Sequence, residues 1–148
     1  MRIALGSDHA GFALKNVIAA RLRQAGHDVV DCGCDDESSV DYPDYGAAVG
    51  KRVAAGESER GVLVCGTGIG IGMAANKIPG IRAATVYDRF TTQMSREHND
   101  ANVLCLGARV LDVTHAAELV EFWLTVPFGG DRHSRRVDKI NQLDGCSA

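Results

Sequence analysis

Short apolar runs alternate with helical patterns along the whole chain, and this alternation limits the folds that the chain can adopt. The run Gly61-Val62-Leu63-Val64-Cys65 is apolar almost throughout, which is typical of a strand buried on both faces of a parallel sheet. Before it, Leu14, Ile18 and Leu22 recur at the spacing of one helix face. Further strands are predicted at residues 2–6, 28–30, 81–86 and 102–106, and helices at residues 14–25, 45–55, 88–97, 114–124 and 133–143.

Helices join the five predicted strands, and such connections produce parallel strands with helices on both faces of the sheet. No linker or internal repeat divides the sequence, so we expect a single domain over residues 1–148. The fold class is α/β: a three-layer α/β/α sandwich built on a Rossmann-like, five-stranded parallel sheet. Ligands of such sheets bind outside the carboxyl ends of the strands, and the functional site is expected there.

Charge and composition argue against several kinds of partner. The chain has 16 basic and 19 acidic residues and a net charge of −3, which provides no basic field for nucleic acid. No apolar run approaches the roughly 20 residues of a membrane span. The first apolar segment meets Asp8 and His9 before it could serve as a signal peptide. We therefore expect a cytoplasmic protein with neither a nucleic-acid nor a membrane partner.

The cysteines are odd in number and irregularly spaced: Cys32, Cys34, Cys65, Cys105 and Cys146. A C-x-C pair without a second pair at zinc-finger distance does not predict a metal site. Free thiols in a cytosolic chain explain the set better than a disulfide framework does. Cys105 lies inside an apolar run and is expected to be a small core residue. Neither a metal nor an organic cofactor is predicted.

A cysteine and a glycine-rich segment close the third predicted strand, at Cys65-Gly66-Thr67-Gly68-Ile69-Gly70. A strand end that faces a helix N-terminus offers free N–H groups and a positive dipole, and both favour a thiolate over a thiol. Glycines let an anion approach the backbone closely, and Thr67 adds a hydroxyl donor. The structural alternative is a tight turn with a buried, inert cysteine.

Known phosphate-binding motifs fit this segment poorly. No G-x-x-x-x-G-K-[ST] sequence is present, and Ile71 stands where a cysteine phosphatase would place its arginine. The dinucleotide fingerprint G-x-G-x-x-A does match residues 70–75, and Asp88 follows the next strand at nearly the right distance. The chain, however, leaves no residues for a separate substrate domain, so this match is weak.

Other polar residues at element ends suggest ligand contacts, each with a structural alternative. Asp8 and His9 follow the first strand, where they either cap the next helix or contact a phosphate or hydroxyl. His98 closes the helix after the fourth strand, where it also suits the helix dipole, and Asn99 beside it can bond to sugar oxygens.

Basic residues near the end of the chain suggest a phosphate site. Arg132 and Arg136 are spaced i, i+4, so on a helix they share a face and can hold one phosphate. A solvated surface helix is the alternative. Arg109 follows the fifth strand, at the edge where the site is expected.

Five segments together resemble ribose-5-phosphate isomerase of type B, in the order and spacing of that family. They are Gly6-Ser7-Asp8-His9-Ala10-Gly11, Asp41-Tyr42-Pro43-Asp44-Tyr45, Cys65-Gly66-Thr67-Gly68-Ile69-Gly70, Arg96-Glu97-His98-Asn99-Asp100-Ala101-Asn102 and Leu106-Gly107-Ala108-Arg109. The resemblance implies an enzyme without cofactor that interconverts D-ribose 5-phosphate and D-ribulose 5-phosphate through a cis-enediolate, in the non-oxidative pentose phosphate pathway.

The resemblance also implies roles for individual residues. Cys65 is the base that moves a proton between C1 and C2 of the sugar, and residues 69–75 hold no acid that could replace it. His98 opens the furanose ring, helped by Asp8. The groups that stabilise the enediolate are Thr67, Asn99 and the backbone of Gly66, Gly68, Ile69 and Gly70. The groups that hold the phosphate are His9, Arg109, Arg132 and Arg136.

The family further implies a homodimer, or a tetramer, with the active site at the subunit interface. In that arrangement the Cys65 loop of one chain meets the His98–Asn99 segment of its neighbour. Two other functions remain open at this point. One is an isomerase of a 6-phosphohexose such as allose or galactose 6-phosphate, whose enzymes share the fold. The other is a non-catalytic module that binds a phosphosugar or a nucleotide.

Overall fold

The computed structural model describes residues 1–145, so the predicted free thiol of Cys146 lies outside the described residues. The five strands form one sheet in the order β2-β1-β3-β5-β4, and every strand pair is parallel. The strands are β1 (Arg2–Ser7), β2 (Asp28–Asp31), β3 (Arg60–Cys65), β4 (Ala83–Thr85) and β5 (Val103–Gly107). The helices are α1 (Phe12–Gln24), α2 (Tyr42–Ala54), α3 (Ile69–Ala75), α4 (Arg89–Glu97), α5 (Val113–Thr125) and α6 (Ser134–Gln142), with short 3-10 turns η1 (Asp131–His133) and η2 (Leu143–Gly145).

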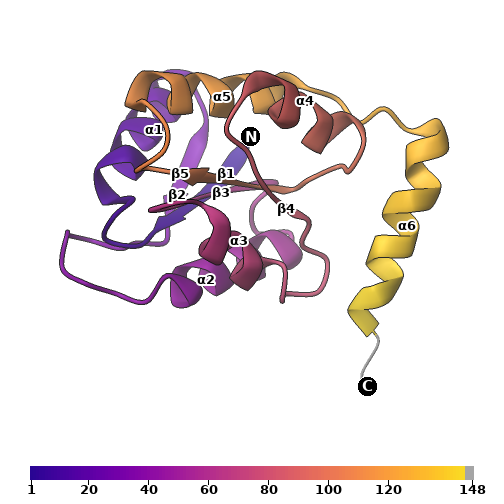
Figure 1. Ribbon diagram of the computed structural model, residues 1–148, viewed down its shortest axis with the longest axis horizontal. Helices are drawn as coiled ribbons and strands as arrows, with labels where there is room; N and C mark the ends of the chain where they lie inside the picture. The colour runs from indigo at the N-terminus through magenta and orange to yellow at the C-terminus, as the bar shows by residue number, and fades with distance from the viewer. Residues whose placement is uncertain (146–148) are drawn as a thin grey trace.

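The elements form three layers, as Figure 1 shows. Helices α1, α4 and α5 cover one face of the sheet, and α2 and α3 cover the other, while α6 stands to one side. This arrangement confirms the predicted α/β/α sandwich with a parallel sheet. Within residues 1–145, no helix is both long and apolar enough to cross a membrane.

Some element boundaries differ from those expected, for local reasons. Helix α2 begins at Tyr42 rather than at residue 45, because Pro43 has the fixed φ angle that suits a first helical turn. The predicted strand 81–86 pairs only over Ala83–Thr85, because the N–H groups just ahead of it bond to a turn carbonyl and to a side chain. Inside the glycine-rich segment, α3 already begins at Ile69.

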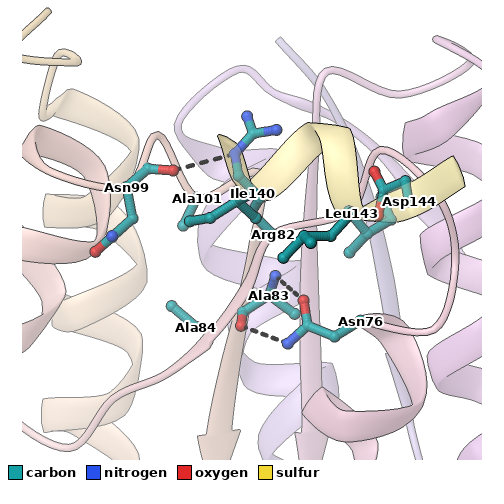
Figure 2. Close-up of a pocket in the computed structure, with 10 residues that line it drawn as sticks. Asn76, Arg82, Ala83, Ala84, Asn99, Ala101, Ile140, Leu143 and Asp144 are labelled. Atoms are coloured by element: carbon teal, nitrogen blue, oxygen red, sulfur yellow. Dashed lines mark hydrogen bonds between the residues drawn. The ribbon is translucent and has the colours of Figure 1, made fainter. Parts of the chain in front are cut away.

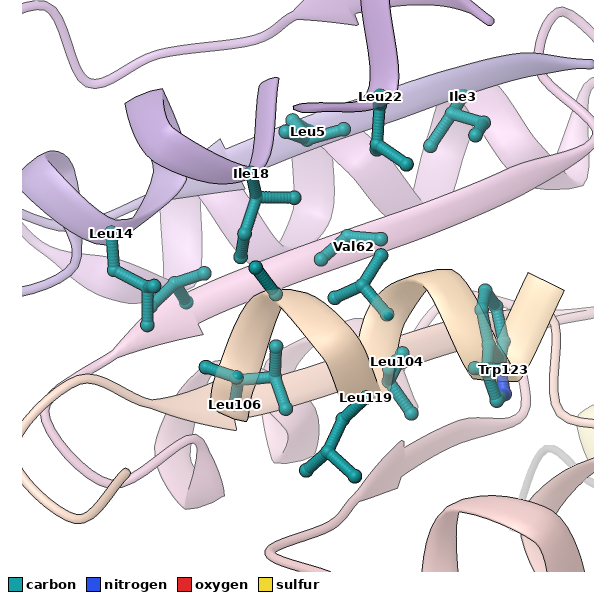
Figure 3. Packing of buried hydrophobic residues seen from close by; sticks show 14 of the residues in the cluster. Ile3, Leu5, Leu14, Ile18, Leu22, Val62, Leu104, Leu106, Leu119 and Trp123 are labelled. Carbon is teal, nitrogen blue, oxygen red and sulfur yellow. The ribbon is translucent and has the colours of Figure 1, made fainter. Parts of the chain in front are cut away.

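The hydrophobic core has one part on each face of the sheet. On one face, α1 and α5 contribute large side chains that Figure 3 shows together: Leu14, Ile18, Leu22, Leu119 and Trp123. On the other face, α2 and α3 cover a smaller cluster that includes Cys65 and Cys105. Cys105 is fully buried, which confirms its predicted place in the core, and this burial raises the pKa of its thiol.

Candidate active site

A cavity of about 380 Å³ lies at the carboxyl ends of β1, β3 and β5. Its place is the one that the parallel sheet predicts, since strand ends and the loops after them meet at this edge. The residues that line it are Asp8, Tyr42, Cys65, Gly66, Thr67, Ile69, Gly70 and Arg109. All of these except Tyr42 were expected from the sequence to belong to the site.

Cys65 is the last residue of β3, and it belongs both to the core and to the wall of the cavity. The Gly68 N–H donates a hydrogen bond to the Cys65 Sγ, with the two atoms 3.1 Å apart. Gly68 has a left-handed φ of 81°, and a Cβ there would lie 2.8 Å from the carbonyl carbon of Leu106. Only glycine therefore allows the loop to turn tightly enough to bring this N–H to the sulfur.

Thr67 follows in the same loop and also lines the cavity. The Ile69 N–H donates to the Thr67 Oγ1 at 3.2 Å, so the hydroxyl accepts one bond and retains its own proton for a ligand. Its carbonyl oxygen accepts a hydrogen bond from the hydroxyl of Tyr87, at 2.8 Å. The loop is thus fixed from two sides.

Asp8 contacts the start of α1, close to the capping role weighed as its alternative, whereas His9 contacts the distant Val40 and does not cap that helix. The Asp8 Oδ1 accepts the Gly11 N–H at 3.0 Å ahead of α1, while the same residue also lines the cavity. The His9 Nδ1 accepts the Val40 N–H at 3.2 Å, so a neutral His9 ring carries its proton on Nε2. His9 is absent from the residues that line the cavity.

Arg109 lies after β5 and closes one side of the cavity. Its backbone N–H donates to the Gly66 carbonyl at 3.0 Å, and a Cβ on Gly66 would lie 3.2 Å from the Arg109 Nη1. The guanidinium therefore lies directly over the glycine. This places a cation beside the Cys65 loop, as an anionic ligand requires.

Tyr42 is the lining residue that sequence reasoning missed. It is the first residue of α2, and a Cβ on Gly70 would lie 2.7 Å from its ring. Pro43 was the available signal: a proline of this type marks a helix start, and helices that follow strands begin at the carboxyl edge of the sheet. With α2 expected to begin at residue 45, Tyr42 was not placed at that edge.

His98 and Asn99 lie at the opposite end of the sheet. Helix α4 begins after the carboxyl end of β4 and runs back beside the strands, so its C-cap, His98, reaches their amino ends. There the Arg82 Nε, just ahead of β4, donates to the Asn99 carbonyl at 3.1 Å. Because β3 alone spans roughly 20 Å at about 3.3 Å per residue, one chain does not bring His98 to Cys65.

The two phosphate-binding candidates on the C-terminal segment accompany His98 rather than Cys65. Arg132 lies in η1 and Arg136 in α6, and both are exposed. Between them, His133 stacks on the His98 ring with the two centroids 4.1 Å apart. His133 was assigned no separate role from the sequence. Its pKa is lowered by desolvation first, and then by His98, Arg132 and Arg136.

Asn99 lines a second cavity, of about 520 Å³, between β4 and α6. Figure 2 shows this cavity with Arg82 at its top and with Ile140 and Leu143 of the C-terminal segment on one wall. In the same view the Asn99 side-chain amide points away from Arg82. The predicted site residues therefore fall into two groups, one at each end of the sheet.

The carboxyl-end cavity combines a thiol, backbone and hydroxyl donors, a carboxylate and a guanidinium. This set suits an α/β protein to bind an anionic ligand outside its parallel sheet, with a group able to transfer a proton beside it. The chain belongs to the ribose/galactose isomerase family, whose profile matches residues 3–140. The resemblance expected from the sequence is thereby confirmed.

Individual relatives match over almost the whole chain. Ribose-5-phosphate isomerase B of Escherichia coli is 44% identical over 143 residues, which cover 97% of this chain and 96% of that protein. The structure of ribose-5-phosphate isomerase B from Clostridium thermocellum has a TM-score of 0.96 at 49% identity, with 97% of each chain covered. That of Mycoplasma genitalium, solved with bound ribulose-5-phosphate, has a TM-score of 0.94 at 38% identity and covers 99% of this chain and 97% of its own.

Proposed function

We propose that the protein is a ribose-5-phosphate isomerase that interconverts D-ribose 5-phosphate and D-ribulose 5-phosphate in the non-oxidative pentose phosphate pathway. One observation carries the proposal: Cys65 lines the carboxyl-end cavity, and its Sγ accepts the Gly68 N–H at 3.1 Å. A base in this position faces donors that can stabilise an anionic intermediate. Relatives that carry this activity in their names support the same reading.

The reaction moves two protons. Cys65, as a thiolate, takes the proton from C2 of the open-chain aldose and returns it to C1, while the hydroxyl proton of O2 moves to O1. The intermediate is a cis-enediolate with negative charge on its oxygens. The Thr67 hydroxyl, which keeps its proton, stabilises that charge together with the N–H groups of Gly66 and Gly70, since preorganised donors act as the charge forms. The Gly68 and Ile69 N–H groups instead bond to the Cys65 Sγ and the Thr67 Oγ1 and hold the loop in shape. No step requires a metal or an organic cofactor.

Ring opening and phosphate binding require residues from both groups. His98, helped by Asp8, moves a proton between the anomeric hydroxyl and the ring oxygen. The phosphate is held from both ends of the sheet, by the guanidiniums of Arg109, Arg132 and Arg136 and by the Nε2–H of His9. Since one chain separates these groups, we propose a homodimer in which His98 of the partner subunit completes the site of the first chain.

Exposed apolar side chains support this pairing. Ile69 and Met73 of α3 are 47% and 64% exposed, directly after the Cys65 loop. The cavity that Asn99 lines has an apolar wall with Ile140 and Leu143, which are also exposed. We infer that the contact between the Cys65 loop and the partner's Asn99 also covers these two apolar surfaces, since exposed apolar patches mark interaction sites.

A direct assay tests the proposed activity. Purified protein with ribose 5-phosphate should form ribulose 5-phosphate at the same rate with and without a chelator. A protein that binds ribose 5-phosphate without converting it would instead be a non-catalytic phosphosugar-binding module, and the proposal would be wrong.

A second candidate is an isomerase of a 6-phosphohexose, because the family includes galactose isomerases in its name. We expect kcat/KM to be higher for ribose 5-phosphate than for allose or galactose 6-phosphate. The reverse order would assign the chain to the hexose enzymes. We further propose that the enzyme works in the cytoplasm, which the free thiols of Cys32, Cys34, Cys65 and Cys105 support.

A further inference from the structure

Arg82 makes an unusual number of contacts for a residue that lies outside the carboxyl-end cavity. Its side chain is only 15% exposed. The Nε donates to the carbonyls of Asn99 and Asp100 at 3.1 and 3.2 Å, and the Nη2 donates to the same Asp100 carbonyl at 2.8 Å. The Nη1 donates to the Asn141 Oδ1 of α6 at 2.9 Å. Every nitrogen of the guanidinium is thus used.

The backbone of Asp100 has a left-handed φ of 46°, which residues other than glycine rarely adopt. The hydrogen bonds from Arg82 stabilise the turn in this conformation. Two guanidiniums hold its carboxylate: the Arg82 Nη2 lies 3.2 Å from one oxygen, and the Arg96 Nη1 lies 2.7 Å from the other. Arg96 is buried and also donates to the Ala101 carbonyl at 2.8 Å. The turn that follows His98 is therefore held from both sides.

The same guanidinium joins this turn to α6. Asn141 lies in the last turn of α6, and the Asp144 carboxylate after it accepts the Gly80 N–H at 2.7 Å. Arg136 lies earlier on the same helix. Arg82 thus connects the segment that carries His98 and Asn99 to the helix that carries a phosphate-binding arginine.

We infer that Arg82 is a positioning residue of the isomerase site: through Asp100 it fixes the His98–Asn99 segment, and through Asn141 it fixes the spacing of that segment from α6. The inference rests on the proposed function. Arg82 acts through contacts within the chain, because each of its three side-chain nitrogens already donates to a neighbouring residue. The contact with Asp100 should affect kcat, and the contact with Asn141 should affect KM.

The test uses full-length variants and initial rates in both directions. Arg82→Met keeps most of the length of the side chain but removes all of its N–H donors. Arg82→Lys keeps the positive charge but not the planar arrangement of the guanidinium N–H groups. Both should lower kcat from ribose 5-phosphate roughly tenfold to a hundredfold, as misplaced catalytic groups do. The loss from ribulose 5-phosphate should be smaller, because that substrate has no ring to open and depends on this segment only through Asn99. Both variants should also show a raised KM.

Two milder variants separate the contacts and remain informative if Arg82→Met does not fold. Asp100→Asn should lower kcat from ribose 5-phosphate with little change in KM, and Asn141→Ala should raise KM with little change in kcat. The losses of Arg82→Met and Asp100→Asn should not add in the double variant, because one contact is shared. Arg21→Met, which breaks a paired contact with Glu121 elsewhere, should leave both constants unchanged.

Amide hydrogen exchange of residues 97–101 distinguishes failure of this inference from failure of the proposed function. We expect faster exchange there in Arg82→Met and Asp100→Asn than in the wild type. Faster exchange in a chain whose wild type has no isomerase activity would contradict the function but not the positioning role. Wild-type exchange, or kinetic losses equal in both directions for Asp100→Asn, would overturn the inference.

Discussion

The imidazole rings of His98 and His133 lie face to face, with centroids 4.1 Å apart and planes inclined by 13°. This stack joins the C-cap of α4 to the turn before α6, so that the proposed ring-opening residue and the proposed phosphate arginines share one local framework. Two stacked imidazoles cannot both become cations without repulsion. The pair therefore links the structure of this segment to pH.

His133 should make the folded state less stable at acidic pH. Desolvation, His98 and the neighbouring arginines lower its folded-state pKa below 6.5, so the unfolded chain takes up the proton first as pH falls. The stability that the neutral His133 ring gives the folded state is fully present above about pH 6.5 and is lost as pH falls through the folded-state pKa. Between about pH 7.5 and about pH 5.5, the free energy of unfolding in urea should fall less for His133→Gln than for the wild type. An equal loss in both proteins would contradict this role.

Cys65 should be the cysteine whose alkylation stops turnover. Iodoacetamide should inactivate the enzyme, and ribose 5-phosphate should protect it, because the sulfur lines the cavity. Cys105 supplies the internal control: it is buried and its thiol pKa is raised, so it should stay unmodified by mass spectrometry. Cys65→Ala should lose roughly a hundredfold or more in kcat and still bind the phosphosugar. Near-normal activity of this variant would remove Cys65 as the base.

Gly68 should tolerate no side chain. Gly68→Ala combines a left-handed φ of 81° with a Cβ 2.8 Å from the Leu106 carbonyl carbon. Gly26→Ala is the matched control, since Gly26 has a similar φ of 87° and no atom within 4 Å of the added Cβ. We expect Gly68→Ala to lower the free energy of unfolding by about 1–3 kcal/mol more than the control, the usual range for overpacking. If urea unfolding shows the same decrease in the free energy of unfolding for Gly68→Ala and Gly26→Ala, the loop can move to accommodate the added Cβ and the prediction is wrong.

The exposed arginines of the C-terminal segment should act on substrate affinity. Arg132→Ala and Arg136→Ala should each raise KM for ribose 5-phosphate, by the equivalent of about 1.5–3 kcal/mol for a charge-assisted contact. Arg135→Ala removes a neighbouring, equally exposed cation and should leave KM nearly unchanged. If all three variants have the same KM for ribose 5-phosphate, the segment attracts the substrate only through its overall positive charge and does not form a phosphate site.

The sequence predicted the carboxyl-end cavity well because that cavity depends only on where strands end. Asp8 and Arg109 follow strands and Cys65 ends one, and a parallel sheet brings the carboxyl ends of its strands together whatever side chains they carry. Tyr42 was missed because a helix start depends on local turn geometry, which the periodic pattern of α2 does not define.

The second group of residues was harder to place. His98 lies far from Cys65 because α4 runs back from the carboxyl end of β4. Sequence periodicity does not reveal the direction of a helix, but the order in which strands and helices are connected does. The contacts of Arg82 with Asn99 and Asn141 could not be predicted at all. They join residues 17 and 59 positions apart through side-chain geometry that no local pattern reveals.

An active site should form only when the Cys65 loop of one chain meets the His98–Asn99 segment of another, and complementation between two inactive variants tests this. Cys65→Ala and His98→Ala chains, each nearly inactive alone, should be unfolded together and refolded, and heterodimers should be identified by mass spectrometry. In a mixed dimer one site carries both defects and the other carries neither. Random pairing makes about half of the dimers mixed, so activity should recover to roughly a quarter of the wild-type value. Heterodimers that form and remain as inactive as their parents would contradict the shared site.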